Sequence, residues 1–183
     1  MVTPGFRIVG ARRLLDIGRG MRVESVDVEG PDGDRFQREV VRHPGAVAVV
    51  PVLADGRAVL VRQWRAAVGE VVLEIPAGLR DVDGEPTEET ARRELAEEVG
   101  YRPGQLQLLT SFWTAVGLLE EVCHVYLATG LEPTALDRHG AEELAMTIER
   151  VELSAVPAMV ADGRIRDSKT IIGLLLARDR LDP

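Results

Sequence analysis

The chain has 183 residues, of which 45% are hydrophobic and 28% charged, a composition typical of a folded protein rather than a disordered one. This length can fill one core and is too short for two ordinary domains. The formal net charge of −8 argues against nonspecific nucleic-acid binding, which depends on Lys and Arg at the phosphates. It leaves room for a small anionic substrate bound through a divalent metal.

Signals for a membrane or for export are absent from the sequence. No apolar run approaches the length of a membrane span, and residues 1–20 lack the continuous apolar stretch of a signal peptide. The single cysteine, Cys123, excludes an internal disulfide and a metal site built on thiolates. We therefore expect a cytoplasmic protein that has neither a membrane nor a nucleic acid as its partner.

In chain order, the hydrophobic pattern predicts several strands and then, after one long helix, further strands and two closing helices. The predicted strands are 21–29, 36–43, 45–53, 57–64, 71–75, 105–112, 122–128 and 147–153. The third and fourth of these strands flank the turn Ala54-Asp55-Gly56 and are expected to form a buried hairpin. The predicted helices are 87–99, 154–161 and 167–177. Strands and helices that do not alternate strictly predict an α+β fold.

The helix over 87–99 has the clearest signals, with Pro86 suited to its first turn and Gly100 to its C-terminal cap. Its buried stripe, at spacings of four residues, is predicted to be Ala91, Leu95 and Val99. Three glutamates gather on a different arc and repel one another: Glu94, Glu97 and Glu98. Arg93 can reach Glu97 one turn away, which leaves the other two glutamates without a cation fixed by the helix.

A glutamate-rich helix face has two explanations. Most such faces are simply solvated surface. The alternative is a hard divalent cation, because carboxylate oxygens are the preferred ligands of Mg²⁺, which also keeps waters and takes substrate phosphate oxygens. The helix alone does not decide between them.

The surroundings of the helix favour the metal. The segment 78–101 resembles the Nudix box, in which a Gly and a Glu precede Arg-Glu-apolar-x-Glu-Glu-x-Gly-apolar. All fixed positions are present: Gly78, Glu85, Arg93, Glu94, Leu95, Glu97, Glu98, Gly100 and Tyr101. Six residues separate Gly78 from Glu85 where five are usual, an insertion that falls in a loop and leaves the helix unchanged. The resemblance implies a Nudix α/β/α sandwich with a mixed central sheet.

The resemblance also implies what each residue does. Mg²⁺, with Mn²⁺ as an alternative, would be held by the box glutamates and one carbonyl: Glu94, Glu97, Glu98 and Ala77. Gly78 would let the backbone turn so that this carbonyl faces the metal. Arg93 and Glu97 count among the catalytic residues, and Arg93 with Glu85 would fix the orientation of the carboxylates. The metal would screen the diphosphate charge and lower the pKa of an attacking water.

Segments outside the box resemble the ADP-ribose pyrophosphatase branch of the family. These segments are 38–52, 61–78 and 165–177. The resemblance implies hydrolysis of ADP-ribose, or of a related nucleoside diphosphate sugar, to a nucleoside monophosphate and a sugar phosphate. It also implies that Arg65 contacts the substrate phosphates, a task that suits the planar guanidinium fork.

The loop 115–121 resembles the stretch in which the family places its catalytic base. Glu121 occupies the base position, and Glu120 is the alternative. The loop departs from the pattern at Val116, where ADP-ribose hydrolases have proline, and at Leu118 and Leu119. These departures leave GDP-mannose and other nucleoside diphosphate derivatives open as substrates. A non-catalytic nucleotide-sensing module is a further alternative, although such modules usually lack some box glutamates.

The N-terminal region, 1–43, is expected to form an additional antiparallel sheet next to a Nudix hydrolase domain over 44–183. Two strands alone bury too little apolar area to be stable and need another surface. In the ADP-ribose branch a similar sheet packs across the partner subunit, so the resemblance implies a homodimer whose partner contributes to the substrate site. The alternative is a monomer in which these strands fold back on their own chain.

Overall fold

The structure is a computed structural model that describes residues 5–181. Contacts within it divide the chain into two compact units. The smaller unit combines the N-terminal residues up to Gly45 with the loop segment Trp113–Val122, and the larger unit contains the rest. Within residues 5–181, every helix falls short of the length or apolarity that a membrane crossing requires.

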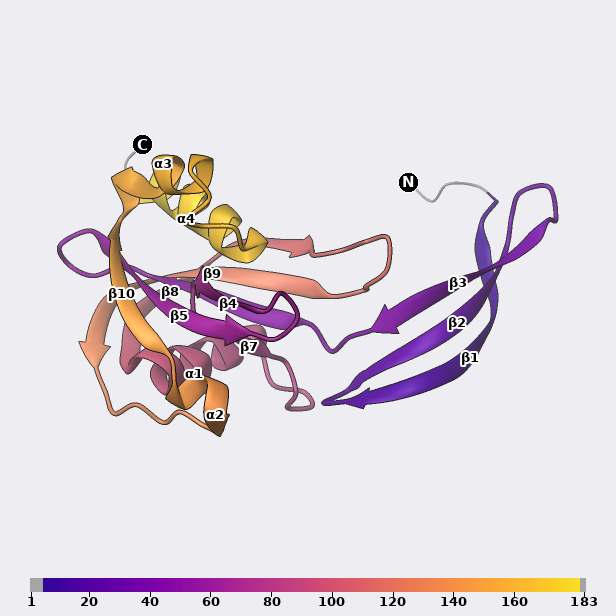
Figure 1. Ribbon diagram of the computed structural model, residues 1–183, viewed down its shortest axis with the longest axis horizontal. Coiled ribbons are helices and arrows are strands. Elements are labelled where there is room, and N and C mark those ends of the chain that lie inside the picture. The colour runs from indigo at the N-terminus through magenta and orange to yellow at the C-terminus, as the bar shows by residue number, and fades with distance from the viewer. Residues whose placement is uncertain (1–4, 182–183) are drawn as a thin grey trace. The chain divides into compact units, whose positions relative to one another are not determined.

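The smaller unit contains a three-stranded antiparallel sheet in the order β1-β2-β3 (Figure 1). Its strands are β1 (Arg7–Gly18), β2 (Met21–Glu29) and β3 (Arg35–Arg42). The strand β1 was not predicted. Its pairing with β2 shifts register between Ile8 and Gly10, between Arg13 and Leu15, and again before Gly18. These bulges break the alternation of apolar and polar residues that identifies a strand in the sequence.

The larger unit contains two sheets. The first is mixed, with the order β7-β4-β9-β8, because β4 runs parallel to β9 and antiparallel to β7. The second is antiparallel, with the order β10-β5-β6. The strand bounds are β4 (Ala46–Pro51), β5 (Arg57–Arg65), β6 (Glu70–Glu74), β7 (Ala77–Leu79), β8 (Tyr101–Trp113), β9 (Val122–Pro133) and β10 (Thr147–Glu152).

The predicted buried hairpin of β4 and β5 is wrong, because the two strands belong to different sheets. Their backbones are linked at the connecting turn, through the bridge of Val52 with Ala58 and the hydrogen bond from the Leu53 N–H to the Arg57 carbonyl. Both faces of β4 and of the first half of β5 are buried, so their continuous apolar runs do not indicate which strand pairs with which.

Helices cover both faces of the strands in the larger unit, as Figure 1 shows, with α3 and α4 on one side and α1 and α2 on the other. The strand β4 divides its side chains between them: Ala48 and Val50 belong to one core with α3 and α4, and Val47 and Val49 to another with α1. The helix bounds are α1 (Thr87–Val99), α2 (Gly140–Leu144), α3 (Val156–Ala161) and α4 (Ser168–Leu181). The α/β/α sandwich and the α+β class are therefore confirmed.

The helix predictions hold with small corrections. The helix α1 has the predicted bounds, but Pro86 is its N-cap in extended conformation and not a first-turn residue. A 3-10 turn, Leu153–Ala155, precedes α3 where one continuous helix was expected. The short helix α2 was not predicted, since five residues are too few for a periodic pattern.

Candidate active site

The site is organised by α1, which packs on the sheets through the predicted stripe. Ala91, Leu95 and Val99 are buried in one core. The helix ends at Gly100, whose backbone is left-handed with φ of 71°. A Cβ at that residue would also meet the Thr134 carbonyl oxygen at 3.0 Å. Glycine is thus required both by the turn and by the close approach.

Two of the three glutamates on the neighbouring arc of α1 are buried. Glu94 is 9% exposed and Glu98 only 4%. The Glu94 carboxylate lies against Gly78, such that a Cβ there would be 2.0 Å from the Glu94 Cδ atom. Glu98 Oε2 accepts a hydrogen bond of 3.1 Å from the Ala77 N–H. The strand β7 therefore fits against both carboxylates, and glycine at position 78 is required by this close approach and not by a turn of the backbone.

Burial makes both carboxyl groups reluctant to ionise. It raises the pKa of Glu94 to about 7, although the charge of Arg93 acts in the opposite direction. Burial also raises the pKa of Glu98 to about 8, and the neighbouring Glu94 charge adds to the effect. Two desolvated carboxylates side by side are unfavourable unless a cation joins them.

Arg93 forms ion pairs with three carboxylates of the Nudix box. Its Nη1 atom donates to Glu94 at 2.7 Å and to Glu97 at 3.2 Å, and its Nη2 atom donates to Glu85 at 3.4 Å. The expectation that Arg93 serves Glu97 and leaves Glu94 without a cation is therefore corrected. The surrounding carboxylates outweigh desolvation and raise the pKa of Arg93. Glu98 alone among the three clustered glutamates has no arginine of the helix as its partner.

The donor set fits a hard divalent cation. Among residues 5–181, no three His, Cys, Asp or Glu side chains converge as a complete metal-binding group. Glu94 and Glu97 both bond to Arg93, and Glu94 and Glu98 lie buried beside Gly78 and Ala77. Two neighbouring carboxylates are a suitable partial shell for Mg²⁺, which keeps several waters and takes substrate oxygens.

Arg65 lies at the end of β5, close enough to the box for its charge to oppose the rise in the pKa of Glu98. Its Nε and Nη2 atoms donate to the two carboxylate oxygens of Glu74, both at 2.7 Å. Its Nη1 atom makes no hydrogen bond to any residue in the range 5–181 and can serve a ligand. The predicted phosphate-binding arginine thus belongs to the same unit as the box helix.

The predicted base belongs to the smaller unit. Glu121 accepts a hydrogen bond of 2.6 Å from the Thr114 hydroxyl and lies 3.6 Å from His43 Nδ1. The alternative, Glu120, is half exposed and accepts a hydrogen bond from Arg42 at 2.5 Å. Both carboxylates are therefore engaged by residues of their own unit.

One acidic residue near the box was not singled out from the sequence. The charge of Glu143, on α2, contributes to the raised pKa of both Glu94 and Glu98. The loop that carries α2 is fixed by Arg138, which donates to the Glu98 carbonyl oxygen from Nε at 2.9 Å and from Nη2 at 2.7 Å. Its Nη1 atom donates to the Met146 carbonyl at 2.7 Å. Nothing in the local pattern of this loop could have revealed Glu143.

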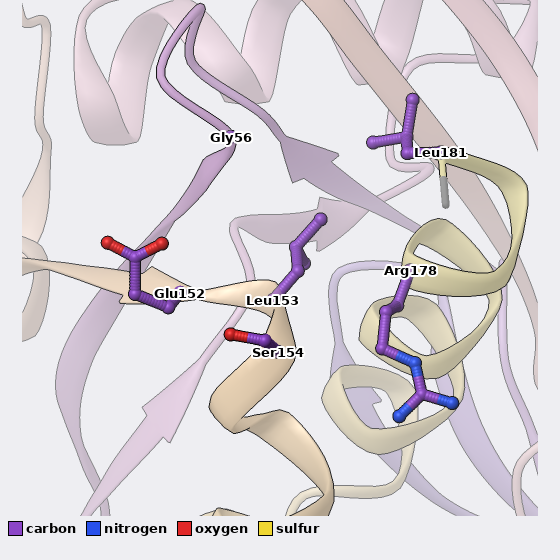
Figure 2. A pocket seen from close by; sticks show the side chains of 6 residues that line it. All are labelled: Gly56, Glu152, Leu153, Ser154, Arg178 and Leu181. Carbon is purple, nitrogen blue, oxygen red and sulfur yellow. The ribbon is translucent and has the colours of Figure 1, made fainter.

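A separate hollow of about 580 Å³ lies on the α3 and α4 side of the larger unit, away from α1 (Figure 2). Its lining residues are Gly56, Glu152, Leu153, Ser154, Arg178 and Leu181. It holds one carboxylate, and its guanidinium already bonds to the adjacent Asp179. This hollow does not resemble a metal or diphosphate site.

Comparisons with known proteins agree on the type of domain. The NUDIX domain family matches residues 42–171. A methanol dehydrogenase activator of Bacillus methanolicus is 39% identical over 159 residues, which cover 86% of this chain and 84% of that protein. An ADP-ribose pyrophosphatase of Bacillus subtilis is 39% identical over 160 residues, which cover 87% and 86%. The crystal structure of an ADP compounds hydrolase superposes with a TM-score of 0.84 at 28% identity, over 97% of this chain and 94% of the other.

Proposed function

The chain belongs to the NUDIX domain family, and from this premise we propose that it hydrolyses the pyrophosphate bond of ADP-ribose or of a related nucleoside diphosphate sugar. The products would be a nucleoside monophosphate and a sugar phosphate. The observation that carries the proposal is the buried pair of Glu94 beside Gly78 and Glu98 beside Ala77, with Arg65 nearby. A purely structural helix gains nothing from such a pair.

We propose Mg²⁺ as the cofactor, with Mn²⁺ as a substitute, since Nudix hydrolases in general use divalent metals. The residues that would hold it are Glu94, Glu97, Glu98 and the carbonyl of Ala77. When bound, the metal neutralises charge on the diphosphate and lowers the pKa of an attacking water. Arg93 and Glu85 keep the carboxylates oriented, as the hydrogen bonds of Arg93 suggest.

Arg65 is proposed to bind the substrate phosphates. Glu74 occupies two of its donors, which fixes the plane of the guanidinium. The outer Nη1 remains available for a phosphate oxygen, and charge-assisted hydrogen bonds of this kind are the strong ones. A fixed cation at this place binds the diphosphate without the entropic cost of ordering a flexible side chain.

Glu121 is proposed as the general base, because it occupies the position at which the family pattern places that residue. Glu143 is a second candidate, supported by the influence of its charge on both buried box glutamates. A base must lie within reach of the attacking water, either directly or through one more water. The two assignments predict different effects of mutation.

ADP-ribose is the proposed substrate because the relative from Bacillus subtilis is named for it and the structural neighbour for ADP compounds. The loop residues Val116, Leu118 and Leu119 depart from the ADP-ribose pattern, so other nucleotide sugars such as GDP-mannose belong in the test.

We also propose a homodimer. Exposed apolar residues of β1 support it, among them Ile8, Leu15 and Ile17. The single cysteine, buried in β9, is compatible with the proposed cytoplasmic setting.

Hydrolysis assays with purified protein over a panel of nucleoside diphosphate derivatives test the proposal. We expect the highest kcat/KM with ADP-ribose, release of AMP, and loss of turnover in EDTA. Glu98→Gln should lower kcat by about 10²-fold or more, because it removes one carboxylate from the metal set. Binding of ADP-ribose without any turnover in Mg²⁺ or Mn²⁺ would instead identify a nucleotide-sensing module.

A further inference from the structure

The first turn of α4 carries polar side chains that face into the protein. Thr170 is fully buried, and the side chains of Lys169 and Asp167 are only 17% and 19% exposed. None of these three residues belongs to the proposed metal or substrate site. Ion pairs of this kind are costly to desolvate, so their presence in a small core calls for an explanation.

Lys169 shares the Glu74 carboxylate with Arg65. The Glu74 side chain is 3% exposed, and its Oε2 atom receives the Arg65 Nη2 donor and the Lys169 ammonium together. Burial alone would raise the pKa of Glu74, but Arg65 and Lys169 outweigh it, and the pKa is lowered. The carboxylate is therefore ionised and held from two sides.

Asp167 fixes Lys169 from the other direction. Its Oδ1 atom lies 3.0 Å from the Lys169 ammonium, and its Oδ2 atom accepts from the Thr170 N–H at 3.0 Å. The second of these contacts is the usual N-terminal cap of a helix. The ammonium is thereby tied to the start of α4, which packs on the sheet through Leu174 and Ala177.

Thr170 completes the connection to Glu74 through the backbone. Its hydroxyl donates to Asp167 Oδ2 at 2.6 Å and accepts from the Ile75 N–H at 2.9 Å. Ile75 follows Glu74 directly and is 1% exposed. One helix turn thus holds both the side chain of Glu74 and the peptide next to it.

We infer that Lys169, held by Asp167 and Thr170, is a positioning residue for the reaction: it fixes the Glu74 carboxylate, which in turn orients Arg65 toward the substrate phosphate. The inference rests on the proposed role of Arg65. A cavity of about 630 Å³ opens beside these groups and is lined by Arg65, Glu74 and Lys169 among others. Without Lys169, Glu74 loses one of its two cations and the guanidinium is free to tilt.

Lys169→Met tests the inference through substrate binding. We expect it to raise the KM for ADP-ribose, and its Kd measured calorimetrically in EDTA, by about tenfold, the usual effect of losing one charged hydrogen bond. The change in kcat should stay within about threefold, because a ground-state phosphate contact acts mainly on binding. Lys169→Arg should recover most of the affinity, since it restores a cationic donor. Arg166→Met is the matched control, because it removes a cation from the same cavity without touching Glu74.

A double-mutant cycle distinguishes positioning from general destabilisation. In an Arg65→Ala background, Lys169→Met should change Kd by less than about twofold, because the guanidinium it orients is gone. Additive effects, or normal affinity in Lys169→Met, would overturn the inference. If Lys169→Met does not fold, Asp167→Asn loosens the same ammonium and enters the cycle in its place. Normal binding without hydrolysis by the wild type would refute the proposed function alone, whereas absence of binding to every nucleoside diphosphate sugar in the panel would refute both.

Discussion

Burial raises the pKa of Glu94 to about 7 and that of Glu98 to about 8 in the absence of a metal. Glutamates in the unfolded chain have a pKa near 4.3. Between about pH 4 and pH 8 the folded state therefore binds more protons than the unfolded state. The free energy of unfolding of the metal-free protein must therefore fall as the pH rises from about 5 to about 8. A divalent cation, which binds the ionised form, should reverse this loss.

Thermal denaturation in EDTA at several pH values measures this effect. We expect Tm to decrease by several degrees between pH 5 and pH 8, and Glu98→Gln to flatten the dependence. The net charge of −8 adds a general effect of the same sign, so the slope is compared with that of the control Glu132→Gln, an exposed residue of β9. Equal slopes in both variants would contradict the assignment of the pair.

The proposed general base is a single carboxylate, and the candidates can be distinguished by mutation. Glu121→Gln should lower kcat by about 10²–10⁴-fold with a much smaller effect on substrate binding, because a proton acceptor acts in the transition state. Glu143→Gln should then have a mild effect. Measurements of kcat and KM for these two variants and for Glu120→Gln show which carboxylate is the base. A large effect confined to Glu143→Gln would transfer the role to α2, and one confined to Glu120→Gln would move it by one residue.

At the scale of elements, the junction of β7 with α1 depends on Gly78. An alanine Cβ there would lie 2.0 Å from the Glu94 Cδ atom. The obstacle is the end of a flexible side chain, so we expect Gly78→Ala to fold with a Tm close to wild type. Displacement of Glu94 should nevertheless lower turnover and metal affinity by about 10–100-fold. Isothermal titration with Mn²⁺ and activity assays measure both. Gly30→Ala, where a Cβ has room, is the control, and full activity of Gly78→Ala would refute the role of Glu94.

Elements with strong local signals could be predicted from the sequence, and elements defined by distant contacts could not. The helix α1 combines a periodic stripe with a terminal glycine, and its bounds were predicted correctly. The strand pairing of β4 was not, because its neighbours β7 and β9 lie far along the chain. The strand β1 escaped detection through its bulges.

The same distinction applies to the candidate site. The Nudix pattern identified residues whose spacing along α1 brings them together, and the structure adds that Glu94 and Glu98 are buried. Lys169 and Glu74 are 95 residues apart in the chain, and their contact depends on the tertiary fold. The sequence pattern therefore identifies residues that lie together on α1, but it does not predict the contact of Glu74 with Lys169, which joins two elements.

At the scale of the whole molecule, the exposed apolar residues of β1 predict a homodimer. Leu15 is 59% and Ile17 52% exposed. Light scattering after gel filtration should therefore give twice the chain mass of 20.0 kDa. Leu15→Glu should shift the mass toward the monomer, since burying an unpaired charge in an interface is costly. Leu108→Glu, at a similarly exposed position of the larger unit, should leave the dimer intact. A wild-type mass of 20 kDa, that of a single chain, would refute the proposed homodimer.

The guanidinium of Arg138 has a consequence for how this protein can diverge. It binds the Met146 carbonyl, which closes the loop between residues 138 and 146, and the Glu98 carbonyl in the last turn of α1, which fixes the base of that loop to the helix. Insertions or deletions inside such a loop cost little and leave the core unaltered. Glu143 would move with every such change while Glu98 stayed in place. Variation in the length of this loop is thus a route by which a lineage can adjust an acidic group relative to the proposed metal site without rebuilding the fold.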